Sequence, residues 1–130
     1  MLKKEITYTD YNGNERTEAY HFHLSKKDLM EMEFSAEGGM QKTIERIVEK
    51  EDVKGLADLI KKIILKAYGE LTEDDRFIKV KDGYKLSEDF EQTEAFSELY
   101  YELNTNEDSL VNFVNGIIPA NLRQEIAARG

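Results

Sequence analysis

Residues 90–122 read FEQTEAFSELYYELNTNEDSLVNFVNGIIPANL and contain two apolar stripes at helical spacing. Residues 104–106 separate the stripes and are of types that end one helix and cap the next. Gly116 suits the left-handed end of a helix, and Pro119 cannot continue its hydrogen-bond ladder. The segment therefore predicts two consecutive helices. The apolar positions are Phe96, Leu99, Tyr100, Leu103, Leu110, Phe113, Val114 and Ile117.

Upstream of this segment, the spacing of apolar residues predicts further helices. Ser25 and Asp28 favour a helix start, and Gly38-Gly39 ends or interrupts that helix. Asp52 caps a third helix, which we expect at the centre of the core, and Ser87 begins another that Thr93 restarts or kinks. The second helix carries Met40, Ile44, Ile47 and Val48, and the third carries Leu56, Leu59, Ile60, Ile63, Ile64 and Ala67.

Residues 4–24 alternate between apolar and polar side chains, which is typical of strands. Asn12-Gly13 interrupts the alternation and tolerates the positive φ of a tight turn, so a β-hairpin is predicted. A small second hairpin is possible near 77–86, around Lys81-Asp82-Gly83. With a last short helix from about 120 to 128, the pattern is an α+β fold: an N-terminal β-hairpin followed by a bundle of five to six helices, in a single domain over residues 1–130.

The composition limits the function more than it defines it. The formal net charge is −9, and no basic patch offsets it, so nucleic acid is not an expected partner. There is no cysteine, no signal peptide and no apolar run that could span a bilayer. We expect a cytoplasmic protein with no membrane partner.

No residue cluster predicts catalysis. His21 and His23 share one exposed face of the predicted hairpin, and the sequence nominates no third or fourth ligand for a metal. Glu49, Glu51 and Asp52 form an acidic cluster, as do residues 73–75, but adjacent acids on polar segments are usually solvated. The serines have no triad partners. We therefore expect a non-enzymatic protein without metal or cofactor.

Four blocks of the sequence, in this order, resemble a known family. They are YTDYNGNERTE at 8–18, LKAYG at 65–69, QTEAFSEL at 92–99 and FVNGIIP at 113–119. They are similar to the small tail assembly chaperones of long-tailed bacteriophages from Gram-positive hosts. The resemblance implies a non-catalytic protein of the host cytoplasm that coats the long helical tape measure protein, helps to recruit tail tube subunits, and leaves before the virion is complete.

A chaperone for an amphipathic helix needs an exposed apolar groove bordered by charge. The two C-terminal helices contain more large apolar residues than two helices packed on one face need, although each such residue could instead complete the core. The predicted protein-binding residues are Phe96, Tyr100, Tyr101, Phe113, Ile117 and Ile118. We also expect a homo-oligomer. The alternatives are a structural tail or connector component retained in the virion, and a host-directed phage effector that binds a host protein.

Overall fold

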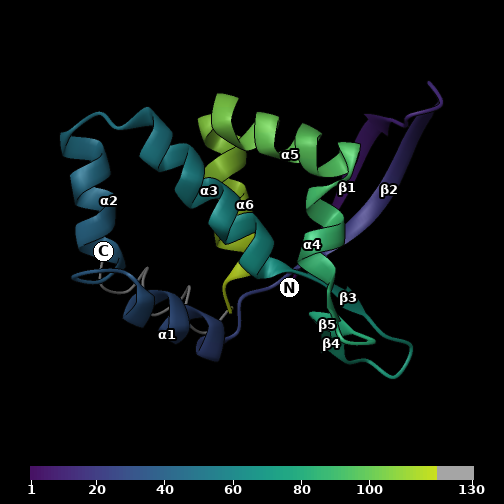
Figure 1. The fold of residues 1–130 in the computed structure, drawn as a ribbon, viewed down its shortest axis with the longest axis horizontal. Helices are drawn as coiled ribbons and strands as arrows, with labels where there is room; N and C mark the ends of the chain where they lie inside the picture. Colours follow the sequence, from purple (N-terminus) through teal and green to yellow (C-terminus); the bar gives the residue numbers. More distant parts are fainter. Residues whose placement is uncertain (120–130) are drawn as a thin grey trace.

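The structure, a computed structural model, describes residues 1–119 and has the predicted α+β architecture (Figure 1). An N-terminal hairpin leads into three helices, a group of short strands, and three more helices. The helix predicted from about 120 to 128 lies outside the described residues. The elements in chain order are β1 (Leu2–Thr9), β2 (Glu15–Phe22), α1 (Lys26–Ser35), α2 (Met40–Glu49), α3 (Val53–Ala67), β3 (Tyr68–Leu71), β4 (Phe77–Ile78), β5 (Val80–Lys81), β6 (Tyr84–Lys85), α4 (Leu86–Glu91), α5 (Glu94–Thr105) and α6 (Glu107–Ile117).

Both predicted hairpins are present. β1 and β2 pair antiparallel from Leu2↔Phe22 to Thr9↔Glu15. Their turn is longer than a two-residue Asn-Gly turn: the N–H of Gly13 donates to the carbonyl of Asp10 at 3.0 Å, and only Gly13 in this turn has a positive φ, of 85°. This is the type I turn with a glycine bulge that three-residue hairpin loops use. The second hairpin pairs β5 with β6.

The hairpin is extended into a sheet of order β1-β2-β3-β4, which the sequence did not predict. β3 pairs with the end of β2 through Phe22↔Tyr68 and with β4 through Glu70↔Ile78. Gly69 permits this arrangement, because a Cβ atom there would lie 2.6 Å from the carbonyl oxygen of Ile78. The packing therefore requires a glycine in β3.

Side-chain caps begin four of the helices as predicted. Ser25 and Asp28 form a reciprocal capping box at α1, and Asp52 accepts the Gly55 N–H at 2.9 Å to begin α3. Thr93 and Asn106 cap α5 and α6 in the same way.

Two helix ends differ from prediction. Ser87 lies inside α4, which begins at Leu86. The residue at the capping position is Lys85, and its side chain makes no capping hydrogen bond. Gly116 lies inside α6, which continues to Ile117, and does not form a left-handed end. A Cβ atom on Gly116 would lie 3.0 Å from the Leu2 side chain, so the glycine allows α6 to approach β1 closely.

The core forms where one face of the sheet meets α3, α4, α5 and α6. Phe22 is fully buried, with its ring centroid 5.1 Å from that of Phe113. The Tyr68 and Phe90 rings stack with centroids 4.1 Å apart. These contacts join the hairpin to helices that lie far from it in the sequence, so the two ends of the chain build one core.

The predicted position of α3 in this core is only half right. Ile60, Ile64 and Ala67, in the C-terminal half of α3, are buried, but Leu56 near its start is 41% exposed. The α2 helix has no buried residue. In Figure 1, α2 lies at the edge of the molecule, on the side opposite the tip of the β1–β2 hairpin. The first half of α3 therefore faces α2 and solvent.

Contrary to the prediction, the two histidines do not lie on an exposed face of a strand. β2 ends at Phe22, and both His21 and His23 are half-buried. The backbone N–H of His23 donates to the carbonyl of Ala67 at 2.8 Å, and its ring lies edge-on to Phe77, with centroids 6.1 Å apart. The histidines are half-buried because the unpredicted strands β3 and β4 pack beside them, where solvent was expected.

Candidate protein-binding site

The apolar stripe of α2 is partly exposed to solvent. Ile44 and Val48 are 47% and 70% exposed, although their spacing is that of a helix face that normally packs on a core. Across the turn, Val53 and Leu56 of α3 are also exposed. Apolar faces of this kind usually mark sites where another molecule packs.

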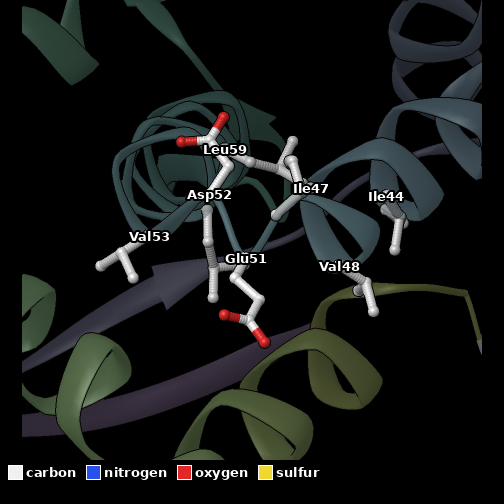
Figure 2. Close-up of a pocket in the computed structure, with 8 residues that line it drawn as sticks. Ile44, Ile47, Val48, Glu51, Asp52, Val53 and Leu59 are labelled. Atoms are coloured by element: carbon white, nitrogen blue, oxygen red, sulfur yellow. The ribbon is translucent and has the colours of Figure 1, made fainter.

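A pocket of about 240 Å³ lies between α2 and the start of α3. Figure 2 shows Ile44, Ile47 and Val48 on α2, Val53 and Leu59 on α3, and Glu51 and Asp52 at the connection between the helices. The residues that line this pocket are Ile44, Ile47, Val48, Glu51, Asp52, Val53, Leu56 and Leu59.

A second pocket of about 300 Å³ adjoins the first, because Ile44 lines both. It extends the apolar surface from α2 towards α1, α3 and the end of α6. We call the two pockets together the α2 groove. The residues that line the second pocket are Leu24, Leu29, Met32, Glu33, Met40, Ile44, Ile63, Val114, Ile117 and Ile118.

The α2 helix ends in a Schellman motif at its turn to α3. The N–H of Glu51 donates to the carbonyl of Val48 at 3.2 Å, and the N–H of Asp52 donates to that of Ile47 at 2.9 Å. Glu51 occupies the left-handed position of this motif with a φ of 50°, where glycine is the usual residue. The next helix starts at once, because Asp52 caps it.

Within the part of the chain that the structure describes, the charged side chains that line the α2 groove are all carboxylates. Glu33 accepts the backbone N–H of Met40 at 3.1 Å, and Asp52 accepts that of Gly55, so both hold helix starts in place. Over residues 1–119, no hydrogen bond or ion pair engages the Glu51 carboxylate. The groove is thus apolar with an acidic border.

The six residues predicted to bind a partner occupy different environments. Three of them are buried in the core, as apolar residues at helical spacing usually are: Phe96, Phe113 and Ile117. Tyr100 is half-buried and stacks on Phe96, with ring centroids 5.8 Å apart. Of the six, Ile117 and Ile118 line the groove, and their role in binding remains a prediction.

Tyr101 lies apart from these residues, on the exposed side of α5. It is 68% exposed and lines neither pocket of the α2 groove. The structure therefore does not bring the six predicted residues together on one surface. The exposed residues of α2 and α3 were missed because their stripes look, in sequence, like ordinary core faces.

Outside the groove, a buried ionic contact joins α1 to the strands. Asp28 is 5% exposed, and its Oδ2 accepts from the Lys79 ammonium at 2.9 Å. Burial works to raise the pKa of Asp28, but the hydrogen bonds from Lys79 and Ser25 outweigh it and leave that pKa below the ordinary value. Burial also lowers the pKa of the neighbouring His23, with a smaller effect from the chain's N-terminus and Lys79.

The described residues show no arrangement typical of metal chemistry or of a membrane span. Within residues 1–119, no three histidine or acidic side chains are placed to hold a metal ion together. In the same part of the chain, no helix is both long enough and apolar enough to cross a bilayer.

Residues 1–129 match a family described as phage tail assembly chaperone. No curated protein and no solved structure matches the chain.

Proposed function

Because this chain belongs to the phage tail assembly chaperone family, we propose that it binds an amphipathic helix of another tail protein in the α2 groove. The partner in this proposal is the tape measure protein, and the bound chaperone helps to recruit tail tube subunits in the host cytoplasm. The role needs no catalysis, since holding and releasing a helix breaks no covalent bond.

The observation that carries the proposal is the apolar face of α2, on which no residue is buried. An amphipathic helix gains most of its stability by packing this face, so α2 is incomplete without something to cover it. A partner helix with apolar residues at every third or fourth position fits the two adjoining pockets, which is the usual mode of helix-in-groove recognition.

The charge of the chain supports the same role. A protein with an exposed apolar groove tends to associate with copies of itself, and the net charge of −9 opposes this. A long helical partner offers many binding segments, so several chaperone copies would cover it. The proposal therefore includes a homo-oligomeric assembly, with contacts between copies outside the α2 groove.

Co-expression with the tape measure protein of the same phage tests the proposal. Val48→Glu or Leu56→Glu places a charge in the groove at an exposed position, so it should abolish co-purification and leave the unfolding midpoint nearly unchanged. Val80→Glu is the matched control, because Val80 is 55% exposed and lies outside the groove. Equal co-purification of all variants would contradict the proposal. The presence of this protein in purified mature virions would also contradict it, because that result indicates a structural component.

Ile118 and Tyr101 test how far the binding surface extends. Ile118 lines the groove, so Ile118→Glu should weaken capture of the tape measure protein. Tyr101→Glu tests the separate exposed face of α5. A collapse of the unfolding midpoint in either variant would assign that residue to the core, and capture unchanged by Tyr101→Glu would confine binding to the groove.

A further inference from the structure

The border of the α2 groove indicates the chemistry of the helix that it binds. We infer that the groove selects an amphipathic helix whose apolar stripe is bordered by lysine or arginine, and that Glu51 is the residue that recognises this basic border. The inference rests on the proposed function of the groove and adds the chemical class of the partner.

The first observation is the sign of the charges. Among residues 1–119, the charged side chains that line the two pockets are Glu33, Glu51 and Asp52, and no lysine or arginine of this part of the chain lines either pocket. The surrounding helices do contain basic residues: Arg46 of α2, for example, donates to the carbonyl of Glu37 at 3.1 Å and lines neither pocket. The charged groups of residues 1–119 that line the groove are therefore all acidic, so acidic residues beside the apolar stripe of an entering helix would oppose binding.

The second observation is that the Glu51 side chain makes no hydrogen bond or ion pair within residues 1–119. Glu33 and Asp52 accept backbone N–H groups at helix starts, whereas no contact within residues 1–119 engages the Glu51 carboxylate. Its ionised oxygens are free to accept hydrogen bonds from an ammonium or guanidinium group.

The third observation is the backbone of Glu51. With a φ of 50°, it stands in a left-handed position that disfavours residues with a Cβ atom and that glycine would fill at lower cost. Strained residues of this kind gather at functional sites. Figure 2 shows the Glu51 side chain leaving the connection between α2 and α3, next to the pocket that both helices form.

Two synthetic peptides with the same composition test the inference against the full chain. Each is about 18 residues long and helical, with leucines at i, i+3, i+4 and i+7. In one peptide the lysines border the leucine stripe, and in its isomer they lie on the opposite face. The equal net charge removes the general attraction of the acidic protein, so a difference in Kd reports on the border alone. We expect the lysine-bordered peptide to bind about two- to fivefold more tightly.

Variants assign this preference to Glu51. Glu51→Gln keeps the size of the side chain and should make the two isomers bind equally. Asp75→Gln is the matched control, because Asp75 is also acidic and left-handed, with a φ of 63°, but lies in the β3–β4 loop away from the groove. It should leave the preference intact. Glu51→Gly should also remove the preference while it raises the unfolding midpoint, which separates recognition from stability.

The outcomes distinguish the inference from the proposed function. Equal binding of the isomers by the unmodified chain, or a preference that survives Glu51→Gln, overturns the inference and leaves the groove as a binding site. Failure of both peptides to bind overturns the proposed site as well. Sedimentation that shows a dimer, together with a monomer in Val48→Glu, identifies a second copy as the occupant of the groove and also overturns the inference.

Discussion

Asp28 connects three parts of the chain that are distant in sequence. Its carboxylate accepts the backbone N–H of Ser25 at 2.9 Å and the Lys79 ammonium at 2.9 Å. Lys79 also donates to the carbonyl of Lys66 at 2.5 Å. Lys79, the residue between β4 and β5, therefore connects the start of α1 with the end of α3.

Replacing Asp28 with asparagine should lower the free energy of unfolding at pH 7 by about 1–3 kcal/mol, the usual loss for a hydrogen bond to a charged group. Because the folded-state pKa of Asp28 lies below 3.8, its contribution is complete above that pH and is lost as the pH falls through the folded pKa. Urea unfolding at pH 7, 4 and 3 checks this. The difference between the two proteins should shrink at pH 3, and a constant difference would contradict the role of the ionised carboxylate.

His23 gives a second pH dependence, with a different range. Its Nδ1 is buried without a hydrogen-bond partner among the described residues. Burial disfavours the charged ring, and the positive charges of the N-terminus and Lys79 add to this effect, so the pKa of His23 falls below 6.5 although Asp28 opposes the shift.

The stability of the protein should therefore decrease as the pH falls below 6.5, since the unfolded chain binds a proton that the folded chain does not. His23→Gln should remove this loss between about pH 6.5 and 5, in unfolding measured by urea. His21→Gln, which removes the other histidine, tests whether the dependence belongs to His23. If His23→Gln keeps the dependence and His21→Gln loses it, the assignment is wrong.

Among the elements, the turn between α2 and α3 combines part of the proposed binding surface with a left-handed residue, Glu51. Glu51→Gly should raise the free energy of unfolding by about 1 kcal/mol, because glycine adopts the left-handed conformation without a Cβ clash. Asp75→Gly should give a similar gain, from its φ of 63°. Thermal or urea unfolding checks both, and a loss of stability in Glu51→Gly would show that its side chain supports the fold.

The starts of the helices could be predicted from the sequence because capping is local. Ser25, Asp52, Thr93 and Asn106 each bind a backbone N–H three residues away, so a short window of sequence contains the whole interaction. The strand β3 could not be predicted in this way. Its four residues become a strand only by pairing with Phe22 and Ile78, and one of those partners lies more than forty positions away in the chain.

The binding site could be predicted only in part, for a related reason. The stripe of Ile44, Ile47 and Val48 shows that α2 has an apolar face, but it does not show what covers that face. The same ambiguity applies to Phe96, Phe113 and Ile117, which are buried by the packing of α5 and α6 on the sheet. Tertiary contacts decide which stripes are core and which remain open.

The whole molecule divides into a packed body and an open side. The hairpin, the second half of α3, α4, α5 and α6 share one core, to which α1 adds Met32, whereas α2 and the first half of α3 have no buried side chain. In Figure 1, α2 lies at the edge of the molecule. Regions with few buried contacts open most easily, so α2 should exchange its amide hydrogens faster than α5 in the free protein. Binding of a helix in the groove would reverse this difference for α2.

Hydrogen–deuterium exchange on the complex with the tape measure protein tests the central claim most directly. We expect new protection over residues 40–56, where the apolar faces of α2 and the start of α3 become covered, with little change in β1 and β2. Protection confined to the hairpin or to α5, or no protection over residues 40–56 in a complex that forms, would contradict the claim that the α2 groove is where this chaperone holds its partner.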